Sequence, residues 1–349
     1  MTKISVLLIS ISIFFGYHSK AQKHSKFQAS FVSPIGTNGL ESRYTSNDYS
    51  FNLLMGTNGG LRKMEIGGLA NVNSGAVSGF QMAGIANINA EKTKGFNLAG
   101  TCNLLAKNAE GFQLAGVCNI VGKEAHGVLI SGASNISQES ASGFQLAPLN
   151  LVGGNFSGVQ LGVFNQVKSL KGMQIGIVNI SDSTENATPF GIFSIVKGGY
   201  YALELSYSQS MQANLSYKMG VEHLYTIFTF GFDNYKNKDL FRYGLGFGSM
   251  LSLGKTHKLA LEATCSQLVY DNSWDDLNLL NRLKTNFHMH VSPDFALFAG
   301  PTFNVYITDK KIGEKYGTID MPHSIYDHES SKNKLFMWIG FNAGISFTF

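Results

Sequence analysis

The sequence has little charge, little proline and few cysteines, and each scarcity excludes a class of protein. Asp, Glu, Lys and Arg make up 14% of its 349 residues, against about 25% in ordinary soluble domains. The net charge is only +4 and no basic stripe is present, so we expect no nucleic-acid partner. The cysteines Cys102, Cys118 and Cys265 are odd in number and lack metal-ligand spacing, which argues against a disulfide scaffold and a cysteine metal site.

Long apolar runs are absent after the amino terminus. There, Lys3 precedes the apolar stretch 4–16, and Ser19 and Ala21 follow with the spacing of a cleavage site. This pattern predicts a secretory signal peptide at residues 1–21. A transmembrane helix needs about 20 apolar residues, and no later segment supplies them. A mature protein that crosses a membrane must therefore use strands.

Strict alternation marks the last fifteen residues. Apolar side chains occupy every second position from Leu335 to Phe349, with mostly small or polar residues between them. A period of two over this length predicts a strand with one face in lipid and the other in a wet lumen. The aromatic terminus resembles the closing strand of bacterial outer-membrane β-barrels, which makes Phe349 the expected assembly signal.

A short repeat fills the first half of the chain. The segments 79–87 (GFQMAGIAN), 95–103 (GFNLAGTCN) and 111–119 (GFQLAGVCN) differ little, and nine copies follow one another between residues 64 and 196. The period is sixteen residues up to Asn135, and the later units GFQLAPLN, GVQLGVFN and GMQIGIVN are one residue shorter between Gly and Asn. Such repetition means that a repeat architecture must be considered first.

Two all-β folds fit this repeat. We predict an antiparallel outer-membrane β-barrel meander in which the nine repeats are strands, because a nine-residue copy matches a tilted membrane strand. In this fold Gln113, Ala115, Val117 and Asn119 face inward, and the lipid-facing residues are Phe112, Leu114, Gly116, Cys118 and Ile120. The alternative is a β-solenoid, with Gln and Asn stacked in ladders, joined to a smaller carboxy-terminal barrel. Identical spacing and the lack of Tyr and Trp between residues 50 and 199 favour the solenoid.

Two cysteines distinguish the folds, because Cys102 and Cys118 occupy the same position in neighbouring copies. Stacked coils would hold them about 4.8 Å apart, whereas the meander separates them by roughly 13 Å. A disulfide needs Cα atoms within about 7 Å, so the predicted meander implies two free thiols.

The second half alternates regularly and has connections of alternating length. We therefore assign N-terminal strands to residues 22–62, the repeat region to 63–196 and barrel strands to 197–349, nineteen strands in all. Long external loops are predicted at 233–240, 271–281 and 309–334. Charged or titratable residues in the inward phase are expected to line the lumen: Glu204, Arg242, Lys258, Glu262, Lys284, His288 and His290.

The sequence gives little support for a metal-binding site. His288 and His290 share one strand face without a third ligand at fitting spacing, so polar lumen lining is the favoured interpretation. A denser group lies in the longest loop, where solvated loop chemistry is the simpler explanation: Asp320, His323, Asp327, His328 and Glu329. We assign no catalytic, cofactor-binding or metal-binding residue.

The GxQxxGxxN copies, among them GMQIGIVNI at 172–180, resemble a surface-repeat family of outer-membraned bacteria. Residues 189–206, 242–249, 277–283 and 298–309 are similar to the uncharacterised barrel-like proteins that carry those repeats. The resemblance implies an outer-membrane location and no catalytic residues. We expect outer-membrane lipids and the outer-membrane assembly machinery as partners.

Two functional hypotheses follow. The first is a non-enzymatic outer-membrane barrel, without cofactor, that acts as a channel or pore for small solutes. The alternative is a surface-exposed structural or interaction protein in which the barrel is an anchor and the loops or repeats meet a partner. A lumen blocked by side chains would favour the second hypothesis, and a continuous wet path would favour the first.

Overall fold

The computed structural model describes residues 23–321 and 323–349, and the chain divides into two compact units. The first unit ends at Ala187 and the second begins at Thr188, somewhat before the boundary expected at residues 196–197. The predicted signal peptide, residues 1–21, lies outside the described residues. Within the described ranges, no helix is long and apolar enough to span a membrane. The all-β fold class is confirmed.

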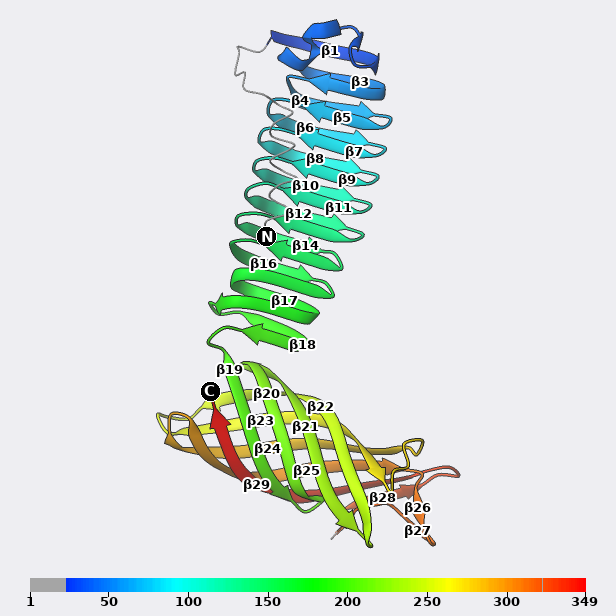
Figure 1. The fold of residues 1–349 in the computed structure, drawn as a ribbon, viewed down its shortest axis with the longest axis vertical. Helices are drawn as coiled ribbons and strands as arrows, with labels where there is room; N and C mark the ends of the chain where they lie inside the picture. Colours follow the sequence, from blue (N-terminus) through cyan, green and yellow to red (C-terminus); the bar gives the residue numbers. More distant parts are fainter. Residues whose placement is uncertain (1–22, 322) are drawn as a thin grey trace. The chain divides into compact units, whose positions relative to one another are not determined.

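The first unit is a parallel β-solenoid of about nine turns, coloured blue to green in Figure 1. A 3-10 helix, η1 (Gly39–Tyr44), lies near its amino-terminal end. The strands of this unit are β1 (Lys23–Val32), β2 (Ile35–Gly36), β3 (Thr45–Asn58), β4 (Gly60–Gly67), β5 (Ala70–Asn73), β6 (Val77–Ala83), β7 (Ala86–Asn89), β8 (Thr93–Ala99), β9 (Cys102–Leu105), β10 (Ala109–Ala115), β11 (Cys118–Val121), β12 (Ala125–Ser131), β13 (Ser134–Ser137), β14 (Ala141–Leu146), β15 (Leu149–Val152), β16 (Asn155–Leu161) and β17 (Phe164–Thr184).

Each regular coil consists of a long strand, a corner, a short strand and a polar turn. In one coil β8 is the long strand, residues 100–101 form the corner and β9 is the short strand. β8 pairs in parallel with β10 of the next coil, with Gly95 opposite Gly111. Gly111 has a φ of +106°, and a Cβ there would lie 2.3 Å from the carbonyl oxygen of Gly95. Only glycine meets both conditions, which explains its return at every coil.

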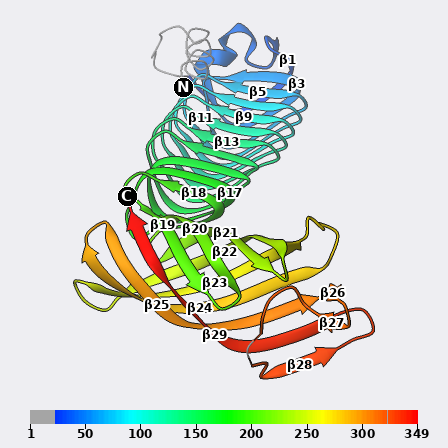
Figure 2. The same ribbon diagram turned by 60° about the horizontal axis from the view of Figure 1, so that its bottom comes forward.

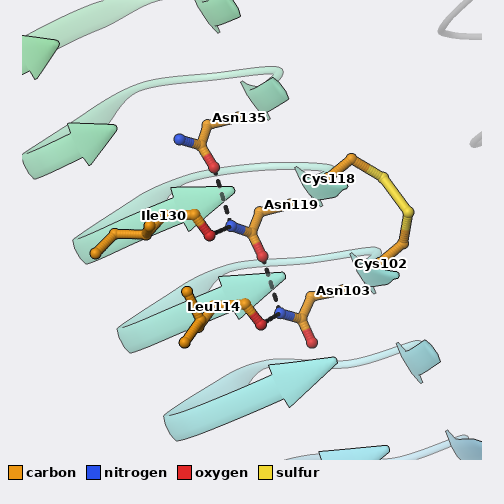
Figure 3. Close-up of a disulfide and its surroundings, with 7 residues drawn as sticks. All are labelled: Cys102, Asn103, Leu114, Cys118, Asn119, Ile130 and Asn135. Carbon is orange, nitrogen blue, oxygen red and sulfur yellow. Dashed lines mark hydrogen bonds between the residues drawn. A yellow bond between two sulfur atoms is a disulfide. The ribbon is translucent and has the colours of Figure 1, made fainter. Parts of the chain in front are cut away.

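A ladder of buried asparagines runs through the solenoid interior (Figure 3). The amide nitrogen of Asn103 donates to Asn119 at 2.8 Å, and that of Asn119 donates to Asn135 at 2.9 Å. Asn119 also donates to the carbonyl of Ile130 at 2.9 Å. Buried amides that find partners in this way keep adjacent coils in register. The ladder comprises Asn71, Asn87, Asn103, Asn119, Asn135, Asn150, Asn165 and Asn179.

The prediction that the repeats are antiparallel barrel strands is therefore wrong, and the solenoid alternative fits. Solenoid strands also alternate between two faces, and here the interior contains buried Asn and Gln beside an apolar cluster. The resulting pattern is therefore similar to that of a barrel with a wet lumen. Gln113, Ala115 and Asn119 are buried as expected, but Val117 is 45% exposed because it lies in the corner. The prediction of free thiols is also wrong. Cys102 and Cys118 are joined by a disulfide with Cα atoms 4.8 Å apart (Figure 3).

The shortened repeats lose their residue at the corner. Leu146 pairs with Ile130 and Leu149 pairs with Ser134, so three intervening residues in one coil become two in the next. Asn150 remains buried and accepts a hydrogen bond from Asn135 at 3.0 Å. A corner can thus accommodate a one-residue deletion. In a continuous strand the same deletion would move every following side chain to the opposite face.

The second unit contains a closed eight-stranded antiparallel barrel (Figure 2). The first barrel strand pairs with both the second and the last, which closes the sheet. A further strand, β18 (Thr188–Val196), precedes the barrel, and the carbonyl of Gly191 accepts a hydrogen bond from Thr226 at 2.6 Å. The barrel strands are β19 (Tyr200–Ser208), β20 (Met211–Val221), β21 (Leu224–Tyr235), β22 (Lys238–Ser252), β23 (His257–Tyr270), β24 (Asn278–Ser292), β25 (Phe295–Thr308) and β29 (Lys334–Thr348).

The connections of the barrel differ at its two ends. At the end where β19 begins, the joins are short: 222–223, 253–256 and 293–294. At the other end, 271–277 and 309–333 are longer, and the latter contains β26 (Lys311–Ile312), β27 (Lys315–Tyr316) and β28 (Tyr326–Glu329). The loop expected at 233–240 is instead a tight turn at 236–237, because β21 and β22 extend farther than expected. The barrel has eight strands, so the count of nineteen strands in one meander is wrong.

Candidate functional site

Four charged side chains from four barrel strands form one ion-pair network in the barrel interior. Lys218 of β20 lies between two carboxylates: its Nζ is 2.5 Å from Glu204 Oε1 and also contacts Glu262 Oε1. The Nζ of Lys284 lies 2.9 Å from the second oxygen of Glu262. All four side chains are buried. Because buried charges are costly unless paired, the two lysines and two glutamates neutralise one another here.

The predicted lumen residues divide between the interior and one end of the barrel. Buried in the interior are Glu204, Arg242, Glu262, Lys284 and His288. The imidazole of His288 stacks on Phe298 with ring centroids 4.9 Å apart, and lies 4.0 Å from the Glu204 carboxylate. Lys258 and His290 are only partly buried, and Lys258 pairs with Glu222 at 2.5 Å.

Two further buried side chains of the barrel interior are arginines. Arg242 donates from Nη2 to Thr229 Oγ1 at 2.8 Å, and Arg282 donates from Nη1 to Ser208 Oγ at 3.3 Å. Both hydrogen-bond partners are hydroxyl groups, which carry no charge. Within the part of the chain that the structure describes, neither guanidinium forms an ion pair with a carboxylate.

Apolar clusters fill both ends of the barrel interior. Where β19 begins, the cluster consists of Tyr200, Ala202, Tyr225, Ile227, Met250 and Ala260. At the opposite end a larger cluster includes Ile319 from the long loop, together with Met211, Leu240, Leu268, Tyr270, Leu280, Tyr306, Phe336 and Trp338. An eight-stranded barrel is just wide enough for side chains to fill it. The charged groups therefore lie between two apolar layers.

The outer surface of the barrel has the opposite polarity. Large apolar side chains alternate along the strands and remain exposed, among them Leu205, Phe230, Phe241, Leu283, Phe287, Phe303 and Phe341. The terminal Phe349 is 71% exposed, its ring lies near those of Tyr201 and Tyr217, and its backbone N–H donates to the carbonyl of Tyr201. An apolar exterior around a charged interior is the polarity of a barrel surrounded by lipid.

The acidic and histidine-rich group in the long loop forms no metal-binding arrangement. Asp327 and Glu329 both pair with Lys334, at 3.1 and 3.5 Å. No group of three or more His, Cys, Asp or Glu residues among those described is arranged to hold a metal ion. Asp320, His323 and His328 take no part in such a site.

The solenoid also presents an ordered outer surface. Phe80, Phe96 and Phe112 occupy the same position in successive coils, and their rings stack with centroids 5.6 and 4.7 Å apart. At the corners a second apolar column is exposed: Leu69, Ile85, Val117, Val163 and Ile177. The polar turns carry the charges instead, with Lys107 paired to Glu91 at 2.6 Å and Lys92 to Glu110 at 2.5 Å. The outer surface is thus amphipathic, with apolar columns and a charged edge.

One carboxylate is buried in the amino-terminal half of the solenoid. Glu65 is fully buried and accepts hydrogen bonds from the side-chain amides of Asn52, Asn58, Asn73 and Gln81, at 2.5 to 3.0 Å. Burial raises the pKa of the Glu65 carboxyl to about 7, although these donors favour the ionised form. Glu65 takes the place in the first repeat that Gln81 and Gln113 take in later ones.

Three of these residues were not among those expected from the sequence: Lys218, Arg282 and Glu65. Lys218 and Arg282 lie in the same inward phase as the expected residues, and Arg282 is only two positions before Lys284. The alternation would have found both if it had been extended along β20 and β24. Glu65 is a charged residue at a repeat position otherwise occupied by amides, which was the available signal.

Comparison with protein families, with curated proteins and with solved structures finds no match to this chain.

Proposed function

We propose that the protein is a non-enzymatic outer-membrane anchor that carries a β-solenoid as an interaction surface. The observation that carries this proposal is the inverted polarity of the barrel. Exposed Leu, Phe and Tyr side chains cover its outside, while six charged groups are buried inside. In water this arrangement would leave a large apolar surface exposed and charges buried, and both are unfavourable. Lipid around the barrel removes the cost of exposing the apolar surface.

The filled lumen favours an anchor over a channel. The Lys218 network occupies the middle of the barrel, and apolar clusters occupy both ends. A conducting barrel needs a continuous wet path, which is typical of barrels with many more strands. We therefore place the function in the solenoid and loops, and solute passage is the alternative that conductance measurements test.

The connections of the barrel suggest the side on which the solenoid emerges. Outer-membrane barrels have short periplasmic turns and longer external loops. Here the chain enters β19 at the end with the short joins, and loops 271–277 and 309–333 lie at the opposite end. By this rule the solenoid is on the periplasmic side, in contrast to the surface exposure that the family resemblance implies.

The solenoid surface suits binding of an extended partner. Its columns repeat at the spacing of parallel strands, so a partner that meets one coil can meet the next in the same way. The stacked Phe80, Phe96 and Phe112 and the exposed corner column offer apolar contact area, and the charged edge restricts how a partner can orient.

Membrane fractionation and cysteine labelling test the proposal. Lys107→Cys on the solenoid edge and Lys332→Cys in the external loop are introduced singly into a background in which Cys102, Cys118 and Cys265 are Ser. Both positions are exposed. We expect the protein to resist urea extraction from outer membranes. A membrane-impermeant maleimide should label position 332 in intact cells and position 107 only after the outer membrane is permeabilised.

Complete extraction of the protein by urea would contradict the anchor. Labelling of position 107 in intact cells would contradict the periplasmic side and return the solenoid to the cell surface.

A further inference from the structure

The buried charges of the barrel interior do not balance. Among the described residues, the buried carboxylates are Glu204 and Glu262, whereas the buried cations are Lys218, Lys284, Arg242 and Arg282. The two lysines and the two glutamates pair with one another. The two guanidinium groups form no such pair, so the buried cations described in the barrel interior exceed the buried carboxylates by two. A buried, unpaired charge costs several kcal/mol in general, so a protein that retains two of them is expected to supply an opposite charge.

Unused hydrogen-bond donors gather around these arginines. Arg242 is 2% exposed and Arg282 is 4% exposed. Of their nitrogens, Arg242 Nε and Nη1 and Arg282 Nε find no acceptor. The hydroxyls of Thr264 and Ser266 on β23 are also buried without a partner. Buried polar groups without partners are uncommon, and here five such atoms, all able to donate, lie in one interior.

The strand register places these groups in one region of the lumen. Arg282 of β24 lies directly opposite Thr264 of β23 on one side and Asn304 of β25 on the other. Two residues further along β23, Ser266 lies opposite Gly244, the next inward residue after Arg242 on β22. β23, which carries both hydroxyls, lies between the strands of the two arginines. The hydroxyl and guanidinium donors thus lie on neighbouring strands. Glu262 lies on the same face of β23, two residues from Thr264, and its carboxylate is already paired with Lys218 and Lys284.

We propose that the barrel interior binds a small inorganic anion between Arg242 and Arg282. The guanidinium groups supply charge-assisted hydrogen bonds, and Thr264 and Ser266 supply neutral ones. The apolar cluster around Trp338 and Ile319 covers this region from the loop end. The anion is therefore covered from the loop end. This site is a structural component of the barrel and does not depend on the function of the solenoid.

Refolding the full-length chain into detergent at constant ionic strength tests the site. Gluconate, a bulky organic anion, is replaced stepwise by bromide in one series and by inorganic phosphate in another. A ligand that binds only the folded state stabilises it by mass action. Above the Kd of the anion that binds, we expect the thermal unfolding midpoint of the barrel to rise by about 3 °C for each tenfold increase in the concentration of that anion. The series that responds identifies the anion as a halide or as phosphate.

The variants separate this site from general salt effects. Arg242→Met with Arg282→Met should make the midpoint independent of both anions. Lys238→Met is the matched control, because Lys238 is an exposed cation paired with Asp271 at 3.0 Å, and it should keep the response of the unchanged protein. The proposal is overturned by a flat response of the unchanged protein, or by an unchanged slope in the double variant.

If the double variant does not fold, anomalous diffraction from bromide-refolded crystals of the unchanged protein decides. A bromide peak between the two guanidinium groups supports the site. Where the bromide series responds, bromide peaks confined to the protein surface, or no peak at all, overturn the site. Where the phosphate series responds, the absence of phosphate density between the two guanidinium groups in phosphate-refolded crystals overturns it.

Discussion

Cys102 and Cys118 occupy equivalent positions in consecutive coils, and a disulfide joins them across Cα atoms that lie 4.8 Å apart. This separation equals the spacing of neighbouring strands in a sheet. The bridge therefore fits the stacked coils without displacing them, and it links two turns of the solenoid across one edge of β9 and β11.

The disulfide should form under mild oxidation and should stabilise the solenoid. It closes a loop with a sequence separation of 16, for which the loss of chain entropy in the unfolded state predicts about 3 kcal/mol. Mass spectrometry of a nonreduced digest should recover the linked peptides, and Cys102→Ser with Cys118→Ser should unfold at lower urea. Cys265→Ser is the control and should behave like the unchanged protein. Two free thiols after oxidation would contradict the coil stacking.

Glu65 should make the stability of the solenoid depend on pH. Its pKa is raised from 4.5 to about 7 in the folded state, so the folded state holds the proton more tightly than the unfolded state. This contribution is complete below about pH 4.5 and is lost as pH rises through 7, a difference of about 3 kcal/mol. Urea unfolding at pH 5 and pH 8, followed by hydrogen exchange in β4 to β7, measures it.

Two variants control for the other titrating groups. Glu65→Gln should remove the difference between pH 5 and pH 8 in these strands, because the amide does not titrate. Glu110→Gln, at an exposed carboxylate paired with Lys92, should leave the difference in place. An equal pH dependence in Glu65→Gln would assign the effect to other groups.

Asn119→Ala should weaken the coils around it. The substitution removes the amide that receives the hydrogen bond of Asn103 and donates to Asn135 and Ile130. Buried partners left unsatisfied cost about 2–3 kcal/mol. Hydrogen exchange should accelerate in β9, β11 and β13. Asn108→Ala, which loses one bond to Glu124 in a polar turn, is the matched control and should change exchange little. Equal acceleration of hydrogen exchange in the two variants would contradict a stabilising role of the asparagine ladder.

Deletion of Phe349 should impair barrel assembly. The residue continues the apolar phase of β29, its N–H bonds to Tyr201 O at 3.1 Å, and its ring lies beside Tyr201 and Tyr217. Its loss weakens the junction of β29 with β19, where the barrel closes. Heat-modifiable migration on gels and outer-membrane yield report assembly, and Phe349→Tyr, which keeps an aromatic ring, should restore both. Normal yield of the truncated protein would reject this role.

Planar-bilayer recordings should show no steady conductance for the refolded protein. The ion-pair network and the two apolar clusters fill the path. Lys284→Glu should likewise remain silent, because it changes one charge between the two apolar layers. A steady conductance whose ion selectivity reverses in Lys284→Glu would reinstate the channel hypothesis.

The sequence by itself determined the period of the repeat, the two-sided character of every strand and the inward phase of the barrel. Gly111, Asn119 and Glu204 could be assigned to their faces because alternation depends only on local strand geometry. The partner of each repeat could not be assigned in this way. A strand with one polar and one apolar face satisfies a barrel wall and a solenoid coil equally well, so only long-range pairing distinguishes them.

The tertiary structure decided the parallel stacking, because the asparagine ladder and the close approach at Gly111 require another coil beside each one. It also decided which charges meet. Lys218 reaches Glu262 across a separation of 44 residues, and Arg242 and Arg282 find no carboxylate among the described residues. Strand phase alone tells that a charge points inward. Closure of the barrel brings distant strands together and thereby determines which charge it meets.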